Sequence, residues 1–160
     1  MRLAVASDHG GFILKGQIIR FLQDNNIECK DFGTYSEESV DYPDFALAVA
    51  EAVAAGEFQL GIVCCGTGIG VSISANKVPG VRAALCHDTF SARMAREHND
   101  ANVLTLGQRV VGAGLALDIV KSFLEGGFDT GGRHSRRIAK MGDIEKKYSL
   151  LEGNTCGRKV

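Results

Sequence analysis

Short apolar runs alternate with amphipathic stretches along most of the chain. Residues 2–8, RLAVASD, form the first apolar run, and the stretch 12–25 that follows repeats its apolar side chains on one helical face. The members of that face are Phe12, Ile13, Leu14, Ile18, Phe21 and Leu22. The same alternation predicts further strands over 27–33, 60–66, 81–88 and 102–107. It predicts further helices from Asp41 or Pro43 to Gly56, over 68–78, 89–100 and 110–127, and from Arg133 to about residue 150.

Strands that alternate with helices predict a parallel sheet with helices on both faces, because each strand–helix–strand unit is right-handed. We expect an α/β fold, a Rossmann-like or flavodoxin-like three-layer α/β/α sandwich. Its five-stranded sheet is expected to have the order 2-1-3-4-5, with an extra C-terminal helix. Residues 1–150 are expected to form a single domain that includes this helix, and residues 151–160 a polar tail without an assigned role.

The composition is that of an ordinary globular protein. Of the 160 residues, 45% are hydrophobic and 23% are charged, and the formal net charge is −1. This charge gives no electrostatic footprint for nucleic acid, and no apolar run approaches the length of a membrane span, about 20 residues. The opening residues, MRLAVASDHGG, turn polar too early for a signal peptide and fit a buried strand better. We therefore expect a cytoplasmic protein with no nucleic-acid or membrane partner.

The chain has an odd number of cysteines and no CxxC spacing, which indicates reduced thiols rather than a disulfide framework. They are Cys29, Cys64, Cys65, Cys86 and Cys156. Neighbouring residues of a strand point to opposite faces, so Cys64 and Cys65 cannot both serve one disulfide, metal or catalytic site. We expect Cys64 to pack as a small hydrophobic side chain. Cys65 ends its strand beside a helix N-terminus, where a thiolate is favoured and could act as a nucleophile or a base.

Two turns rich in chemistry are predicted to meet at one edge of the sheet. Ligands of doubly wound sheets bind outside the carboxyl ends of the strands, where the strand order reverses. That point lies between strands one and three, which end in Ser7-Asp8-His9-Gly10-Gly11 and Cys65-Gly66-Thr67-Gly68. Asp8 and His9 place a carboxylate beside an imidazole, a pair suited to proton transfer between oxygens. Alternatively, Asp8 caps the first helix and His9 is a surface turn residue.

The glycine loop 66–70 follows a strand and enters a helix, so its backbone N–H groups can point at one anion or at a developing oxyanion. It is not a Walker loop, because no Lys-Ser/Thr follows, and it is not GxGxxG. No acidic residue stands where a nucleotide ribose would need one. A nucleotide site is therefore disfavoured, whereas glycines that merely allow a tight turn remain an alternative.

Three arginines are candidates for binding a phosphate. Arg109 follows the fifth strand, and Arg133 and Arg137 are four residues apart, hence on one face of a helix. Guanidinium groups bind phosphate bidentately, and such a pair can clamp one phosphate. The alternative for the helical pair is a solvated basic face that also includes Arg136 and Lys140.

Taken together, the motifs resemble a known family. SDHGGF, DYPDFA, CGTGIG, SANKVPGVRAA, REHNDANVL, LGQRVVG and GGRHSRRI occur in this order and extend to about residue 148. The sequence is similar to the RpiB-type ribose-5-phosphate isomerases, whose family also includes galactose-6-phosphate and allose-6-phosphate isomerases. The resemblance implies an aldose–ketose isomerase that interconverts ribose 5-phosphate and ribulose 5-phosphate without a metal or organic cofactor. It also implies a homodimer, sometimes paired into a tetramer, with active sites at the dimer interface.

The resemblance further implies roles for single residues. Cys65 matches the catalytic base, and the loop that holds the reacting end of the sugar matches Gly66, Thr67, Gly68, Ile69 and Gly70. His98 matches the proton donor of ring opening, while Asp8 and His9 match substrate-binding positions. Which of these three opens the ring stays undecided.

The remaining matched positions bind the rest of the substrate. Asn99 matches a substrate contact, and Tyr42 matches an aromatic side chain that lines the pocket. Arg109, Arg133 and Arg137 match phosphate and substrate contacts, some of them reaching across from the other subunit. One branch of the family uses a glutamate just after the glycine loop as its base. That position is Val71 here, which indicates the cysteine branch.

Three other functions compete with ribose 5-phosphate isomerisation. The first is isomerisation of a phosphorylated hexose such as allose 6-phosphate or galactose 6-phosphate, because pocket depth does not follow from the sequence. The second is a non-catalytic sugar-phosphate sensor, against which the retained Cys65, Asp8 and His98 argue. The third is a flavin- or nucleotide-binding module, which the missing phosphate fingerprint disfavours.

Overall fold

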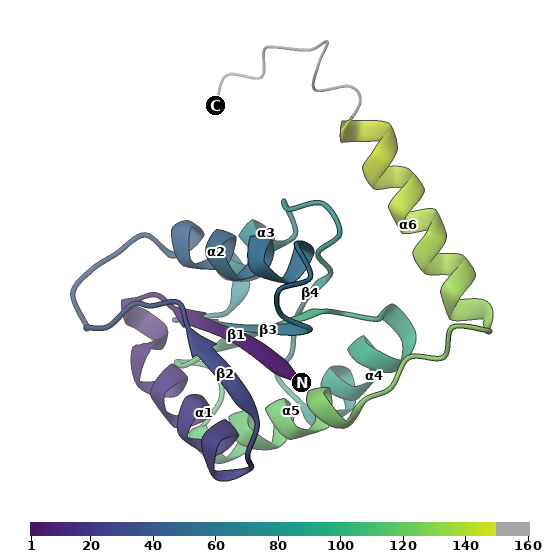
Figure 1. The fold of residues 1–160 in the computed structure, drawn as a ribbon. Helices are drawn as coiled ribbons and strands as arrows, with labels where there is room; N and C mark the ends of the chain where they lie inside the picture. Colours follow the sequence, from purple (N-terminus) through teal and green to yellow (C-terminus); the bar gives the residue numbers. More distant parts are fainter. Residues whose placement is uncertain (150–160) are drawn as a thin grey trace. The chain divides into compact units, whose positions relative to one another are not determined.

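The computed structural model describes residues 1–149, and it contains the predicted strands and helices (Figure 1). The strands are β1 (Arg2–Ser7), β2 (Glu28–Asp31), β3 (Leu60–Cys65), β4 (Ala83–Leu85) and β5 (Val103–Gly107). The helices are the short 3₁₀ turn η1 (His9–Gly11), α1 (Phe12–Asp24), α2 (Tyr42–Ala54), α3 (Ile69–Ala75), α4 (Thr89–Asn99), α5 (Ala113–Glu125) and α6 (Arg133–Ser149). The predicted polar tail and Cys156 lie outside the described residues.

The five strands form one parallel sheet in the order β2-β1-β3-β5-β4. The α/β class and the parallel sheet are confirmed, but the predicted order 2-1-3-4-5 is wrong for the last two strands. β5 is buried along all five residues, whereas β4 has only three residues, all of them half-buried. A strand whose two faces are both apolar and covered belongs inside a sheet, so β5 pairs with β3 and the short β4 takes the edge.

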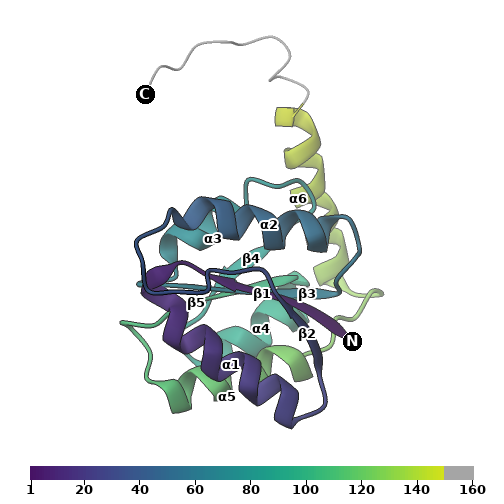
Figure 2. The ribbon, with the colours of Figure 1, turned by 60° about the vertical axis from the view of Figure 1, so that its left-hand side comes forward.

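The sheet separates two hydrophobic layers, as expected of a three-layer sandwich. Helices α1, α4 and α5 cover one face, and α2 and α3 cover the other (Figure 2). Successive residues of β3 enter opposite layers: Cys64 packs with the α1 side and Cys65 with the α2 side. The expectation that the two neighbouring cysteines face opposite ways is therefore confirmed.

The chain forms two compact units. The first, Met1–Phe128, holds the whole sheet and the helices α1 to α5, and the second begins at Asp129 and contains α6. Along its described length α6 buries no residue, and it exposes the apolar side chains of Met141, Ile144 and Tyr148. The single domain over 1–150 stays a prediction. None of the described helices is both long and apolar enough to span a membrane.

Gly16 gives a simple test of the first helix. It is exposed in the middle of α1, and a methyl group there would meet no atom within 4 Å. Alanine restricts the unfolded chain more than glycine does, so Gly16→Ala should raise the free energy of unfolding by about 0.5–1 kcal/mol. Urea denaturation followed by circular dichroism measures this, and a destabilised variant would contradict the description of α1.

Candidate active site

The carboxyl ends of β1, β3 and β5 meet at one edge of the sheet. Ser7 is in register with Cys64, and Cys65 with Gly107. The turn after β1 joins β3 directly, because the N–H of Asp8 donates to the carbonyl oxygen of Cys64 at 3.2 Å. The expected meeting of the first and third turns is confirmed. With β5 rather than β4 beside β3, the turn that carries Arg109 joins them.

Asp8 and His9 are fixed by the turn that they form. Asp8 is 6% exposed, and its Oδ1 accepts the N–H of Gly11 at 3.0 Å, so it caps η1. The Nδ1 of His9 accepts the N–H of Val40 at 3.2 Å. In the neutral imidazole the proton is then on Nε2, which is the nitrogen able to donate. Asp8 therefore has the capping role that was the alternative to proton transfer. The hydrogen bond from Val40 ties His9 to the segment that leads into α2.

Glycines let the first turn approach β3 closely. A methyl group on Gly11 would lie 2.5 Å from the carbonyl carbon of Cys64, and one on Gly10 would lie 3.1 Å from the nitrogen of Gly66. Any larger residue at position 11 would push the backbone of η1 away from β3. The two glycines of SDHGGF therefore set the distance between Asp8 and the glycine loop.

Gly68 shapes the glycine loop. Its φ is +78°, and a methyl group there would lie 2.5 Å from the Cδ1 of Leu85 and 2.8 Å from the carbonyl carbon of Leu106. Only glycine combines this backbone conformation with such a close approach. Gly107, the last residue of β5, is equally close to the loop: a methyl group there would lie 2.5 Å from the carbonyl of Thr67. The loop thus lies against the end of β5, a contact that the sequence did not reveal.

The two cysteines have different chemical surroundings. The Sγ of Cys65 accepts the N–H of Gly68 at 3.0 Å, and its side chain is 5% exposed. This hydrogen bond fixes the sulfur at the glycine loop. Cys64 is fully buried, and this burial, with smaller contributions from Cys65 and Asp8, raises the pKa of its thiol. The two thiols thus differ in position: Cys65 lies at the glycine loop, whereas Cys64 packs in the opposite layer as a buried, neutral side chain.

Two side chains flank the glycine loop. The guanidinium of Arg109 lies over Gly66, where an added methyl group would be 3.5 Å from it, and the N–H of Arg109 donates to the carbonyl oxygen of Gly66 at 3.0 Å. The ring of Tyr42, the first residue of α2, would lie 2.7 Å from a methyl group on Gly70. The structure thus brings Arg109 and Tyr42 to the loop that carries Cys65.

His98 and Asn99 form the last turn of α4. Arg82 holds this end of the helix: its Nε donates to the carbonyl oxygens of Asn99, at 3.1 Å, and Asp100, at 2.9 Å. Its Nη2 also pairs with the carboxylate of Asp100 at 2.8 Å. At the other end of α4, hydrogen bonds from Ser91 hold the pKa of Asp88 below its usual value. Both ends of the helix that carries His98 are thus capped.

Arg133 and Arg137 belong to the second unit. They lie one turn apart on α6 and are both exposed, and the Nε of Arg133 contacts the Nε2 of His134 at 3.3 Å. The prediction that they share one helical face is confirmed. The turns after β1, β3 and β5 all belong to the first unit.

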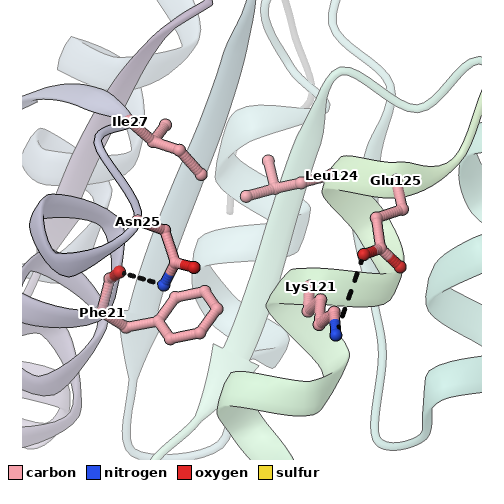
Figure 3. Close-up of a pocket in the computed structure, with 6 residues that line it drawn as sticks. All are labelled: Phe21, Asn25, Ile27, Lys121, Leu124 and Glu125. Carbon is pink, nitrogen blue, oxygen red and sulfur yellow. Dashed lines mark hydrogen bonds and ion pairs between the residues drawn. The ribbon is translucent and has the colours of Figure 1, made fainter.

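Cysteines 29, 64, 65 and 86 are free thiols, and within residues 1–149 no group of three or more His, Cys, Asp or Glu side chains is arranged to hold a metal ion. A pocket of about 200 Å³ lies between α1 and α5, near the carboxyl ends of both helices (Figure 3). Its lining is Phe21, Asn25, Ile27, Lys121, Leu124 and Glu125. None of these is a predicted site residue, and Ile27 immediately precedes β2, so the pocket lies toward the amino ends of the strands.

The ribose/galactose isomerase family model matches residues 3–141. The chain belongs to the ribose/galactose isomerase family. This membership confirms the resemblance read from the motifs, makes the chain an isomerase and implies a phosphorylated sugar as substrate.

Relatives of this family match over nearly their whole length. The ribose-5-phosphate isomerase B of Escherichia coli is 47% identical, over 91% of this chain and 97% of that protein. The solved structure of Clostridium thermocellum ribose-5-phosphate isomerase B is 60% identical, with a TM-score of 0.90 and coverage of 92% and 99%. A Mycoplasma genitalium ribose-5-phosphate isomerase B, solved with bound ribulose 5-phosphate, is 44% identical with a TM-score of 0.86, over 91% and 97%.

Proposed function

We propose that the chain interconverts ribose 5-phosphate and ribulose 5-phosphate, with Cys65 as the base. The observation that carries this proposal is the position of its sulfur: at the carboxyl end of β3, under the N–H of Gly68, in a loop flanked by Arg109 and Tyr42. The names of the Escherichia coli and Clostridium thermocellum relatives and the ribulose 5-phosphate in the Mycoplasma genitalium structure support the choice of substrate.

The chemistry needs one group that moves a proton between two adjacent carbons. Removal of the C2 proton of the open-chain aldose gives an ene-diolate, and return of a proton to C1 gives the ketose. A thiolate on one face of the substrate can do both, because its proton affinity is moderate. The proposed steps use only groups of the chain itself, without a metal or an organic cofactor.

The glycine loop is proposed to stabilise the ene-diolate. Negative charge that appears on the C1 and C2 oxygens requires hydrogen-bond donors already in place. The loop offers backbone N–H groups between Gly66 and Gly70 together with the hydroxyl of Thr67. Ile69 at the start of α3 is 51% exposed and adds an apolar wall.

Ring opening is proposed to involve Asp8, His9 and His98, since pentose phosphates are mainly cyclic and an acid and a base must open the ring first. His9 can donate through Nε2 while Val40 occupies its Nδ1. Asp8 is held by its bond from Gly11 beside the same turn. Among the three, the proposal assigns the proton donor of ring opening to His98, because the family resemblance implies it. The chemistry of the side chains alone allows any of the three.

The phosphate is proposed to bind the guanidinium groups of Arg109, Arg133 and Arg137, with Asn99 and Tyr42 contacting the sugar. Binding energy from the phosphate then holds the small reacting end in register. We further propose a homodimer, or a tetramer of two dimers, with active sites at the interface. Exposed apolar side chains support this: Ile69 and Ile73 beside the glycine loop, and Met141, Ile144 and Tyr148 on α6. In this role the enzyme would act in the pentose phosphate pathway, in the cytoplasm.

A phosphorylated hexose is the second candidate substrate, because the matched family description covers galactose as well as ribose. We expect kcat/KM on ribose 5-phosphate to exceed that on allose 6-phosphate and galactose 6-phosphate by about 10–200-fold, the range that one additional carbon group allows. A coupled assay on the three sugars measures this, with Cys65→Ala protein as the control for contaminating isomerases. Faster turnover of a hexose phosphate would make that sugar, and not ribose 5-phosphate, the substrate. Binding of the sugar phosphates without turnover of any of them would favour a non-catalytic sensor.

A further inference from the structure

Lys15 is buried where a helix normally presents an apolar side chain. It lies on the face of α1 that also buries Leu14 and Ile18, and only 2% of its side chain is exposed. An ammonium group removed from water is unfavourable unless its charge is paired and its protons are bonded. The groups that bond to the Lys15 ammonium therefore indicate which parts of the chain its charge holds together.

All three protons of the Lys15 ammonium have an acceptor. The Nζ donates to both carboxylate oxygens of Asp31, at 2.7 Å each, and to the carbonyl oxygen of Thr34 at 2.6 Å. The rings of Phe12 and Tyr35 also lie near the ammonium, with centroids 5.6 and 5.1 Å from Nζ. One side chain thus joins the first helix, the end of β2 and the chain that follows β2.

The segment 33–41, which connects β2 to α2, begins at this cluster. The N–H of Gly33 donates to Oδ1 of Asp31 at 2.8 Å. Gly33 and Thr34 also bond to the last residue of β1: Ser7 donates to the Gly33 carbonyl and accepts from the Thr34 N–H, both at 2.7 Å. The start of the segment is therefore fixed against the residue that precedes Asp8.

The same segment ends at the active site. The N–H of Val40 donates to Nδ1 of His9, and two residues later Tyr42 begins α2 with its ring against Gly70. The contacts that fix the start of the segment therefore also limit the positions of Val40 and Tyr42 at its end. Hydrogen bonds from an ammonium to a carboxylate and a carbonyl are directional, whereas an apolar side chain would fill the space without fixing the segment.

We propose that Lys15, paired with Asp31, is a positioning residue for the isomerase reaction. It holds segment 33–41 so that His9 presents Nε2, and Tyr42 its ring, to the sugar phosphate. Lys15 itself touches no substrate. The proposal rests on the function proposed above for the role of His9 and Tyr42, whereas the anchoring of the segment can be measured without any activity.

The test compares the wild type with Lys15→Met/Asp31→Asn, which removes the charged link, leaves no unpaired buried charge and keeps an amide oxygen for the N–H of Gly33. We expect a folded protein in which the amides of 33–41, Val40 included, exchange with deuterium about tenfold faster or more. We expect KM for ribose 5-phosphate to rise about tenfold while kcat stays within about threefold, because the groups that shift bind substrate rather than move its C2 proton.

The matched control is Arg2→Met/Glu28→Gln. This exposed pair, 2.7 Å apart, also holds β2, but it joins the amino end of β2 to that of β1, away from segment 33–41. It should leave amide exchange of 33–41 and KM unchanged. The contrary result is a folded Lys15→Met/Asp31→Asn protein with the amide exchange rates and the KM of the wild type. That result would overturn the proposal and show that the Lys15–Asp31 ion pair does not position the active site.

Two outcomes are kept apart by the design. If the double variant does not fold, Asp31→Asn alone decides, since it leaves Lys15 bonded to Thr34 and is expected to move exchange and KM in the same direction. An Asp31→Asn protein with unchanged amide exchange and unchanged KM then overturns the proposal.

If the wild type has no isomerase activity, the proposed function fails, and the exchange measurement still decides whether Lys15 anchors the segment.

Discussion

Replacing Cys65 with alanine should lower kcat on ribose 5-phosphate by about 10²–10⁴-fold, the range that a positioned acid–base group contributes. The sulfur is the group proposed to take the C2 proton, and it lies within hydrogen-bond distance of the N–H of Gly68. Substrate should still bind, because the loop N–H groups and Arg109 remain. Steady-state kinetics gives kcat, and calorimetric titration of the variant gives the affinity.

The neighbouring cysteine is the matched control. Cys64→Ala removes a sulfur from the opposite, fully buried face of β3, so it should cost about 1–2 kcal/mol of stability and leave kcat within about threefold. Near-normal turnover by the Cys65 variant would remove this residue from the mechanism. Loss of turnover in the Cys64 variant, with its fold intact, would contradict the division of roles between the two thiols.

Gly68→Ala should damage both stability and catalysis. Its φ of +78° costs an alanine about 1–2 kcal/mol, and the approach of Leu85 and Leu106 to within 2.5 and 2.8 Å of a methyl group adds about 1–3 kcal/mol. We expect the free energy of unfolding to fall by about 2–5 kcal/mol. The loop must shift to relieve the overlap, which moves the N–H away from the sulfur of Cys65, so kcat should fall as well. Urea denaturation and steady-state kinetics measure the two effects.

Gly56 separates backbone strain from steric overlap. It follows α2 with a φ of +76°, nearly that of Gly68, and a methyl group there would meet no atom within 4 Å. Gly56→Ala should therefore lose only about 1–2 kcal/mol and keep its kcat. Equal losses in the two variants would show that the close approach to β5 does not matter.

Local patterns predicted the elements well because each is determined by neighbouring residues. Helix α2 illustrates this: Pro43 stands in its first turn, and Gly56 follows its end with a positive φ. The order of the last two strands failed for a different reason. The runs 81–88 and 102–107 look similarly apolar in sequence, and only tertiary packing shows that β4 shortens to Ala83–Leu85 while β5 is buried throughout.

The site could be predicted as far as strand ends define it. Cys65 ends a parallel strand, Asp8 and Arg109 closely follow two others, and the carboxyl ends of parallel strands lie at one edge. Lys15 was missed, although its spacing from Leu14 and Ile18 places it on the buried face of α1, and this is the signal that could have found it. Gly107 gave no signal, because its need for glycine arises only where Thr67, distant in sequence, crosses the end of β5.

The central claim is that Cys65 takes the proton from C2 of the substrate, and ribose 5-phosphate carrying deuterium at C2 tests it most directly. Mass spectrometry and NMR follow the cleavage of the C2–deuterium bond, whether the label then appears at C1 or in water. Wild-type and Cys64→Ala proteins should cleave this bond, whereas Cys65→Ala should bind the sugar and leave the label at C2. Cleavage by the Cys65→Ala protein at the wild-type rate would contradict the claim.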